Sequence, residues 1–551
     1  MGVQRVWTFL LLLLSVAVAD LRLQTSIPFE TDASPAEVAA NRMDFLIIVG
    51  DVSTDMARVL YEPLVTGATI DIVLEAATAD GRFERVAAQS RAHTQPMPYV
   101  KTFDGLVPHR QHRVRFALNG HDVAEAMFRT APTPSDATDV RVLSVSCDRF
   151  SEDADDTHWS TLAADIASDD SYFGIVHTGD QIYADQLVDL AVAQIKAASA
   201  LSFEETLSAF RDLYRRCFGR PMLQYVLRRG AHWMLIDDHD IINNWSYANL
   251  ESPQHEVLVR AGLQAFYEYQ FQLLHDVNWQ EMDFAQTHNW SSLYLPGHAL
   301  RRIGNLSLLL VDTRLDRGLQ TTAAAPTLMS DHQLRFVQET LDAKVDGERL
   351  VLFTPLPLFF HTKYSAAFAD LVDGEMYPGL DVYRPFFRQL WPHLAHASLL
   401  VGGDLHMTAD TTVCGHVGSG NWSCLPQLIT SGMTQASTTM DQLKIISFHF
   451  AITQVLQPFH WLYAALVPRT RTEFAMLSKH VYYGKNYGYV RLAANHTLSY
   501  GAVAQPYTTG GATLVQMASD MLSWAVHNAA LSSALCLASY LAYARLHSQS
   551  P

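Results

Sequence analysis

Residues 173–185 read FGIVHTGDQIYAD, a stretch that joins an apolar run to a group of polar residues. Its first part is a mainly apolar run of strand length, and its second part turns polar at Gly179. An apolar run that gives way to a Gly-Asp pair predicts a buried strand ending at Asp180, with Tyr183 on the following turn. A carboxylate placed there can bridge two cations, and a phenolate three residues later can reach one of them. The stretch therefore predicts a metal-binding strand end.

Other apolar runs on either side of this stretch end in residues of similar chemistry. Strands are predicted at residues 140–147, 173–180, 232–238, 306–314, 349–355 and 397–404. Amphipathic segments of helical length lie between them, at 204–229, 255–275 and 330–344. This alternation predicts an α/β layered fold, a β-sheet core with flanking helices, in which active sites gather at the carboxyl ends of the strands. Nearly every one of these strands ends in a chemically useful residue, and these residues are Cys147, Asp180, Asp238, Arg314 and Asp404.

The sequence before residue 130 has a different pattern. Short strands separated by turn residues are predicted at 45–49, 57–61, 69–76, 112–118 and 125–129. This spacing is typical of a small all-β sandwich of immunoglobulin or fibronectin type, which we assign to residues 28–132. No titratable cluster stands out within it, so we expect a non-catalytic accessory domain. Residues 130–139, TAPTPSDATD, predict a linker to a catalytic domain at 139–510.

Two terminal segments concern the location of the protein. Residues 1–19 have the features of a secretory signal peptide: a basic start, an apolar run and an Ala-Val-Ala end. Residues 513–545 form an apolar helix-length segment, and its part 521–544 has no formally charged residue, so membrane association through it is an open alternative. We expect a protein of the secretory pathway, secreted or membrane-anchored, with its catalytic domain outside the cytosol.

The cysteines and glycosylation motifs agree with that location. Cys414 and Cys424 bracket a Gly-rich stretch and predict a disulfide-closed hairpin. N-x-S/T motifs, which predict a glycoprotein, begin at Asn244, Asn289, Asn305, Asn421 and Asn495. The net charge of −17 argues against a nucleic-acid-binding surface, whereas a small anionic substrate stays possible where a metal ion supplies positive charge.

Two further clusters contribute to the predicted site. LIDDHD at 235–240 follows an apolar strand, and buried acidic clusters are costly unless they are paired or bind metal. VGGDLH at 401–406 supplies Asp404 and His406, preceded by glycines that let the backbone approach closely. Taken singly, a Gly-Asp pair is often only a turn and Cys147 is more often a core residue. Together, clusters on successive strand ends are hard to explain as turns.

In this order the motifs resemble the alkaline phosphatase D (PhoD-like) family of metallophosphatases. They are SCDR (146–149), HTGDQIYAD (177–185), DDHDIINNW (237–245), VDTR (311–314) and GGDLH (402–406). The resemblance covers about residues 29–504 and includes the sandwich domain before the catalytic core. It implies that Cys147, Asp180, Tyr183 and His406 hold Fe³⁺. It also implies that Asp180 bridges to a second cation, which Asp238 and Asp404 complete.

The resemblance leaves the second cation partly open. In the similar purple acid phosphatases the position of Asp238 is Asn and the next His acts near the leaving group, which suggests His239 as general acid or phosphate contact. Asn243 and Asn244 are rivals for the metal-binding role. The sequence VLFTPLPLFF has Thr354 and Pro355 where the usual metallophosphatase has another His. An oxygen-rich second site favours Ca²⁺ or another hard divalent cation.

The predicted reaction is hydrolysis of a phosphate ester by direct attack of a metal-bound water or hydroxide. Arg314 is either a bidentate contact of the phosphate or the partner of a neighbouring Asp. A phosphodiesterase or phospholipase-like activity is the close alternative. A non-catalytic binding protein on a degenerate phosphatase fold is the alternative from another class.

Overall fold

The structure, a computed structural model, describes most of the chain between Phe45 and Ala504. The described residues are 45–64, 67–95, 97–153, 156–185, 187, 202–245, 256–286, 292–315, 317, 327–359, 381–417, 422–435, 473–482 and 484–504. The predicted signal peptide at 1–19 and the apolar segment at 513–545, with its uncharged part 521–544, lie outside these residues. Among the described helices, none combines the length and the apolar character needed to span a membrane.

The catalytic part of the chain is built on two mixed sheets. The five-stranded sheet has the order β10-β9-β8-β18-β19, and the seven-stranded sheet has the order β11-β12-β13-β14-β16-β15-β17. The strands of the first sheet are β8 (Val140–Val145), β9 (Tyr172–Thr178), β10 (Ala231–Leu235), β18 (Asn486–Leu492) and β19 (Leu498–Ala504). Those of the second are β11 (Ala299–Ile303), β12 (Leu306–Leu310), β13 (Arg349–Thr354), β14 (Leu399–Gly402), β15 (Thr408–His416), β16 (Ser423–Thr430) and β17 (Glu473–Tyr482).

The alternation of side chains along the strands separates the layers. In β8, Val142 faces a central core, whereas Leu143 faces a core shared with helices. In β13, Val351 joins the central core and Leu352 joins a third core on the other side. The two sheets therefore pack face to face with helices on both outer sides, which is the layered fold that the sequence predicted.

Helices cover the outer face of each sheet. On the first sheet they are α3 (Thr157–Ala167), α5 (Phe203–Phe218), α6 (Pro221–Leu227) and α7 (Glu256–Phe266). α7 continues into a π-helix (Tyr267–Phe271) and the short α8 (Gln272–Leu274). On the second sheet they are α9 (Asp331–Asp342) and α11 (Arg384–Leu394). The other helical elements of the described residues are short 3₁₀ helices at Phe150–Glu152, Asp238–Asp240, Trp279–Glu281 and Asp381–Tyr383.

Local sequence explains where the helices begin and end. The hydroxyl of Ser330 accepts a hydrogen bond from the Gln333 amide at 3.2 Å and caps the start of α9. The single helix predicted at 204–229 was wrong. α5 ends at Phe218 with Gly219 as its C-cap, and α6 starts at Pro221, because proline has no amide hydrogen to donate and the first turn of a helix does not need one.

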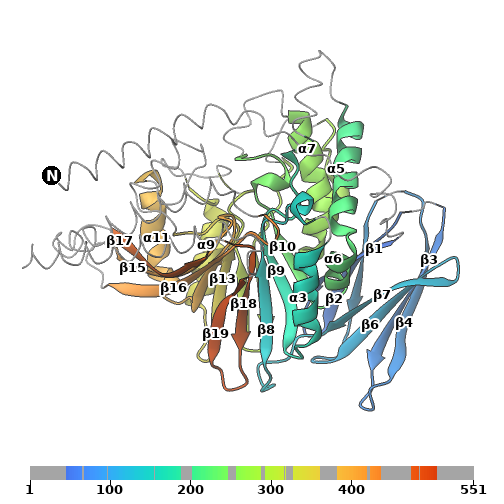
Figure 1. The fold of residues 1–551 in the computed structure, drawn as a ribbon, viewed down its shortest axis with the longest axis horizontal. Helices are drawn as coiled ribbons and strands as arrows, with labels where there is room; N and C mark the ends of the chain where they lie inside the picture. Colours follow the sequence, from blue (N-terminus) through green and yellow to red (C-terminus); the bar gives the residue numbers. More distant parts are fainter. Residues whose placement is uncertain are drawn as a thin grey trace, which may run out of the picture.

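The N-terminal strands form two antiparallel sheets, and they fit a β-sandwich loosely. One has the order β1-β2-β5 and the other β4-β3-β6-β7. The strands are β1 (Phe45–Val52), β2 (Met56–Pro63), β3 (Thr69–Ala77), β4 (Phe83–Ala92), β5 (Tyr99–Asp104), β6 (Gln111–Leu118) and β7 (His121–Arg129). Figure 1 shows these strands at one end of the molecule and β15 and β17 at the other. β4 and β5 were not predicted.

This N-terminal region shares its core with the catalytic region. Every residue of β1 is buried, and alternate side chains of this strand join the two cores that flank the five-stranded sheet. The Ile47 amide donates to the Gln224 side chain of α6 at 3.2 Å, and the Trp233 indole of β10 donates to Asp51 at 2.8 Å. The first N-terminal sheet therefore packs into the same hydrophobic cores as the catalytic region.

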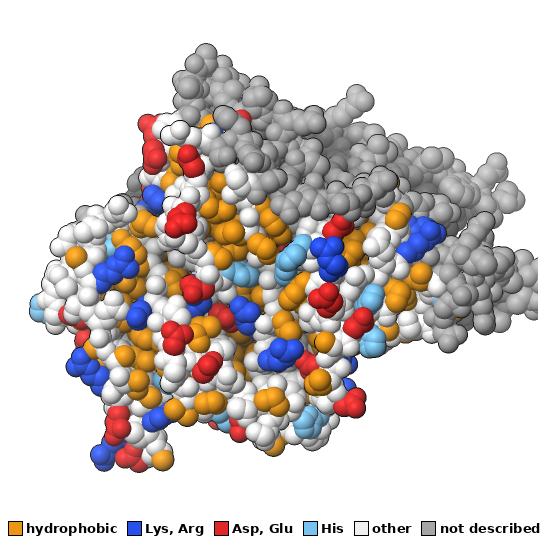
Figure 2. Space-filling model, turned by 180° about the vertical axis from the view of Figure 1, so that it is seen from behind, with side chains coloured by type: hydrophobic (Ala, Val, Ile, Leu, Met, Phe, Trp, Pro, Cys, Tyr) orange, Lys and Arg blue, Asp and Glu red, His pale blue; other side chains and the backbone are white. Residues whose placement is uncertain are grey.

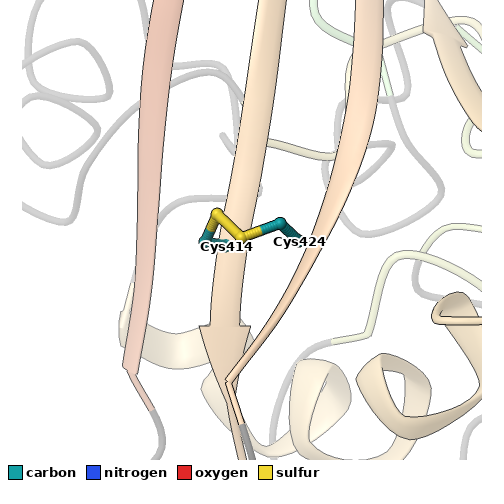
Figure 3. The surroundings of a disulfide bond; sticks show 2 residues. All are labelled: Cys414 and Cys424. Carbon is teal, nitrogen blue, oxygen red and sulfur yellow. A yellow bond between two sulfur atoms is a disulfide. The ribbon is translucent and has the colours of Figure 1, made fainter.

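The predicted disulfide is present. Cys414 of β15 and Cys424 of β16 are directly paired in the antiparallel ladder and their sulfur atoms are bonded (Figure 3). Among the described cysteines, Cys147 and Cys217 are free and buried.

Candidate metal centre

The carboxyl ends of β8, β9, β10 and β14 meet between the two sheets. Cys147 follows β8, Asp180 follows β9 and His406 follows β14. The Cys147 thiol lies 3.4 Å from Asp180 Oδ2 and 3.7 Å from the Asp404 carbonyl oxygen. The Tyr183 hydroxyl lies 3.0 Å from His406 Nε2 and 3.4 Å from Asp180 Oδ2. The first and second sheets thus place their polar strand ends in one cluster.

Among the residues that the structure describes, three groups of side chains have donor atoms close enough to share a metal ion. Within each group the donor atoms all lie within 4.8 Å of one another. The groups are Cys147 with Asp180 and His406, Asp180 with Asp238 and His239, and Asp237 with Asp238 and Asp404. Asp180 belongs to the first two groups, and Asp238 belongs to the last two. The arrangement suits two neighbouring cations that share Asp180.

Backbone strain is concentrated at the same residues. The φ angles are 60° at Cys147, 57° at Asp180, 67° at Asp404 and 49° at His406. Non-glycine residues rarely adopt this left-handed region, at a cost of about 1–2 kcal/mol each. The fold therefore keeps four donor residues in an unfavourable conformation, and strain of this kind is typical of functional sites.

Two glycines allow the strand ends to approach each other. A β-carbon at Gly403 would lie 2.6 Å from the Ser146 hydroxyl and 2.7 Å from the Thr178 carbonyl oxygen. A β-carbon at Gly179 would lie 2.4 Å from Cβ of Asp237. The close approach that the sequence predicted for GGDLH is thus present, and it extends to the Gly179 turn.

The charge of the cluster fits a cation. Asp180 is 1% exposed, and its Oδ1 has no hydrogen-bond partner. Burial is the main reason that the pKa of Asp180 lies well above its usual value, and the Asp238 carboxylate adds to this effect. A buried carboxylate oxygen without a partner is costly, and a bound metal ion removes that cost.

The pKa values of the other donor side chains are shifted as well. Burial, and then the charge of Asp180, raises the pKa of the Cys147 thiol well above its usual value. The pKa of the Tyr183 hydroxyl is raised in the same direction, first by burial. Burial lowers the pKa of His406 to about 3, so its imidazole is neutral at neutral pH and able to act as a ligand. Thiol and phenol must lose their protons when they bind a metal, so metal affinity at this site depends on pH.

His239 has a carboxylate behind its ring. Its Nδ1 lies 2.9 Å from Asp185 Oδ1, and the ring stacks on Tyr183 with a centroid distance of 4.5 Å. Burial opposes protonation, but Asp238 and Asp185 outweigh it and raise the pKa of His239 well above its usual value. The sequence did not single out Asp185, the residue that orients this ring.

Arg314 forms a buried ion pair with Asp237. The side chain is 1% exposed, its Nε donates to Asp237 Oδ1 at 2.7 Å, and a terminal nitrogen lies 2.6 Å from the same oxygen. The same terminal nitrogen lies 3.6 Å from Asp238 Oδ1. Although burial opposes ionisation, Arg314 lowers the pKa of Asp238 to about 2. Of the two alternatives for Arg314, the geometry favours the ion pair over the contact with a phosphate.

The rivals of Asp238 lie beside it. The Asn244 backbone amide donates to Asp238 Oδ2 at 2.6 Å, so this asparagine supports the carboxylate through its main chain. Asn243 is exposed. Thr354, at the end of β13, is buried.

Arg149 is a further cation near the cluster that the sequence did not single out. Its guanidinium carbon lies 5.7 Å from the centroid of the Tyr183 ring, and the side chain is half-buried. Figure 2 shows that Lys and Arg are mixed with Asp and Glu over the described part of one face, without a continuous basic area.

Residues 142–352 match the family described as PhoD-like phosphatase. The chain carries a PhoD-like phosphatase domain. This confirms the family that the motifs predicted and the enzyme class, a hydrolase acting on phosphate esters. The matched residues include Cys147, Asp180, Tyr183 and Asp238, whereas Asp404 and His406 lie beyond them.

The fold of the PhoD-like domain and its N-terminal extension is similar to that of a solved structure. A structure of PhoD superposes with a TM-score of 0.55 at 14% identity, covering 89% of this chain and 97% of that one. A purple acid phosphatase from yellow lupin (Lupinus luteus) seeds gives a TM-score of 0.47 at 12% identity, covering 84% of this chain and 72% of that one. No curated protein matches the chain.

Proposed function

We propose that this protein is a metal-dependent phosphoesterase that hydrolyses phosphate esters with water and forms no phosphoenzyme. The observation that carries the proposal is the meeting of Cys147, Asp180, Tyr183 and His406 at one point between the two sheets. Donors from β8, β9 and β14 are needed to build this point, and it lies within and next to a PhoD-like domain.

The donor set fits two different cations. Cys147, Tyr183 and His406 would hold Fe³⁺ together with Asp180, because thiolate and phenolate are anionic donors suited to a highly charged ion. Asp180, Asp238 and Asp404 offer only carboxylate oxygens, the ligands that Ca²⁺ and other hard divalent cations prefer. When bound, the cations acidify water and neutralise charge on the phosphate.

The remaining residues of the site have roles that follow from their contacts. His239 is placed as a proton donor to the leaving oxygen, because Asp185 contacts its Nδ1 and because Asp238, followed by Asp185, raises the pKa of the ring. Arg149 is placed to bind a phosphate oxygen near Tyr183. Arg314 acts indirectly, by orienting Asp237 and holding Asp238 ionised.

The central test is the replacement Asp180→Asn. The variant should lose turnover of an aryl phosphate and lose bound metal, because Asp180 belongs to two of the donor groups that would hold the cations. Asp122→Asn, the same change at an exposed residue of β7, is the control and should behave as wild type. Full activity of the Asp180 variant would overturn the proposal. Elemental analysis that finds neither iron nor a hard divalent cation in reconstituted wild-type protein would favour a binding protein instead.

The leaving group needs a separate test. Phosphomonoesters, phosphodiesters and phospholipids should be compared with one protein preparation, with and without calcium. We propose the monoester as the preferred substrate, since Arg149 adds a local cation for the dianion. A higher kcat/KM for diesters or phospholipids would reverse that preference.

We also propose a location in the secretory pathway. The Cys414–Cys424 disulfide supports it, because structural disulfides persist in oxidising compartments. Sequencing the N-terminus of the mature chain tests the signal peptide, with cleavage expected before Asp20. Alkaline extraction of membranes tests an association through 521–544.

A further inference from the structure

Asp240 connects two loops of the metal centre although it belongs to none of the three donor groups. Its carboxylate is completely buried and accepts hydrogen bonds from four backbone amides. Oδ1 accepts from Gln181 at 3.0 Å and Ile182 at 3.2 Å. Oδ2 accepts from Asp180 at 3.1 Å and Asp237 at 3.1 Å. One side chain therefore holds the loop after β9 and the loop after β10 together.

Helix capping explains only part of this arrangement. Asp240 and Asp237 form a reciprocal capping box around the 3₁₀ turn Asp238–Asp240, which accounts for the bond from the Asp237 amide. The other amides belong to residues about 60 positions earlier in the chain, in the turn that carries Asp180. Their convergence on one carboxylate fixes the left-handed conformation of Asp180, whose φ is 57°.

The π-helix supplies the side-chain contact of Asp240. Gln270 is completely buried in it and donates from Nε2 to Asp240 Oδ1 at 3.3 Å and to the Tyr214 hydroxyl at 2.8 Å. A π-helix has an extra residue per turn and changes the direction of the side chains that follow. Here the irregular turn lies where a helix of the outer layer must contact the metal loops.

The same π-helix contacts the N-terminal sheet. The Tyr269 hydroxyl donates to Glu62 Oε2 of β2 at 2.8 Å, and its ring stacks on Tyr214 with a centroid distance of 4.7 Å. Arg215 of α5 binds the other oxygen of Glu62 at 2.7 Å. A continuous set of buried contacts thus leads from β2 through the π-helix to Asp240.

We propose that Asp240 is a positioning residue that holds the Asp180 loop in its metal-binding shape, and that Gln270 of the π-helix fixes Asp240 in place. Through Tyr269 and Glu62 the N-terminal sheet then contributes to the alignment of the metal centre. The inference rests on the proposed function in one respect, that Asp180 is a metal ligand.

Metal affinity of the full chain tests the inference without any assay of activity. Protein stripped of metal is titrated with Tb³⁺, a hard cation whose luminescence is sensitised by nearby aromatic side chains. Asp240→Asn puts an amide among backbone donors, and we expect its affinity for Tb³⁺ to fall roughly 10–100-fold, as when a residue behind a metal ligand is changed. A purely structural role would lower the melting temperature and leave the affinity of the folded protein unchanged.

A second pair of variants covers the case in which Asp240→Asn does not fold. Gln270→Leu removes the contact with Asp240 and should weaken Tb³⁺ binding roughly two- to tenfold, as for the loss of one buried hydrogen bond. Gln264→Leu is the matched control, because this residue of α7 donates only to Glu268 among the contacts described, at 2.9 Å. The inference would be wrong, and the proposed function untouched, if the two leucine variants bound Tb³⁺ equally well. The same holds if a folded Asp240→Asn variant bound Tb³⁺ with wild-type affinity. Failure of the wild-type chain itself to bind Tb³⁺ would overturn the metal centre as well.

Discussion

The two sheets of the catalytic region bring their strand ends to one place by different means. At the strand ends of the first sheet, buried carboxylates hold the loops in place. Asp240 accepts a hydrogen bond from the Asp180 amide. Asp148, next to Cys147 in the chain, contacts Thr434, Trp159 and Arg220. At the strand end of the second sheet, close packing at glycine and a hydroxyl group hold the loop in place. Gly403 leaves space for Ser146, and the Ser431 hydroxyl accepts from the His406 amide at 3.0 Å.

This difference predicts different sensitivities. The loops of the first sheet depend on buried charge, so they should respond to changes in polarity, donor chemistry and protonation. The loop of the second sheet depends on free space at glycine, so it should respond to volume. Both kinds of loop carry donor residues with positive φ, so both must be held against backbone strain.

The largest effect is expected for a donor of the first sheet. Changing a residue that only contacts a metal ligand typically costs roughly 10–100-fold in activity, and Cys147→Ser should lower kcat by more than that. The variant should also contain less metal, because Cys147 is one of the proposed ligands. Cys217→Ser is the matched control, because Cys217 is also buried and free and a serine hydroxyl can still donate to the Gln181 carbonyl oxygen. Steady-state kinetics and metal content measure both variants. If the two serine variants behave alike, Cys147 is only a core residue.

The second sheet should respond to added volume. Gly403→Ala places a β-carbon against Ser146 and Thr178, and we expect about 1–3 kcal/mol of lost stability together with lower metal affinity. Gly347→Ala is the comparison, since its β-carbon would have nothing within 4 Å while its φ is 85°. It should lose stability through its backbone alone and keep wild-type metal binding. Urea unfolding and metal titration separate the two, and normal metal binding by the Gly403 variant would contradict the role of close packing.

A smaller effect is expected for Arg149, the cation beside Tyr183. Arg149→Gln should raise KM for an aryl phosphate about tenfold at nearly constant kcat, because a charge-assisted contact with the phosphate is lost. Arg302→Gln, the same change at a side chain that is 63% exposed, controls for net charge. Michaelis–Menten kinetics at constant ionic strength decide this, and an unchanged KM would remove Arg149 from the substrate site.

The smallest effect concerns pH and the buried histidines of the first sheet. His232 of β10 and His177 of β9 contact each other at 2.9 Å, and burial lowers the pKa of His232 to about 4. Because the unfolded chain takes up a proton near pH 6.5 and the folded chain does not, stability falls as pH drops below that value. We expect His232 to account for about 1 kcal/mol of lost stability between about pH 7.5 and about pH 6. His232→Gln should reduce this dependence, and the exposed His121→Gln should not; chemical unfolding at both pH values is the measurement.

Much of the layered fold and the meeting of the strand ends could be predicted from the sequence. Buried parallel strands are continuous apolar runs, and their ends are marked by the first polar residues, so Cys147, Asp180 and Asp404 could be placed at one edge. β4 was missed because it is exposed along its length and therefore has no apolar alternation. The break between α5 and α6 was missed although Gly219 and Pro221 mark it.

The supporting contacts could not be predicted, because they join residues far apart in the chain. Arg314 and Asp237 are separated by 77 positions, so the sequence alone left an ion pair and a phosphate contact equally open. Asp185 and His239 are 54 positions apart, and only the fold brings the carboxylate behind the ring. The π-helix also depends on packing, since nothing in the sequence YEYQF distinguishes it from an ordinary helix.

The burial of β1 on both faces has a consequence for how the protein unfolds. Its side chains belong to cores on either side of the five-stranded sheet, so this strand cannot separate without exposing both. The N-terminal strands and the strands that end at the metal residues should therefore melt as one cooperative unit, with coincident transitions for probes in either region. Residues 45–132, part of the accessory domain that the sequence placed at 28–132, would then be an obligatory part of a foldable catalytic unit.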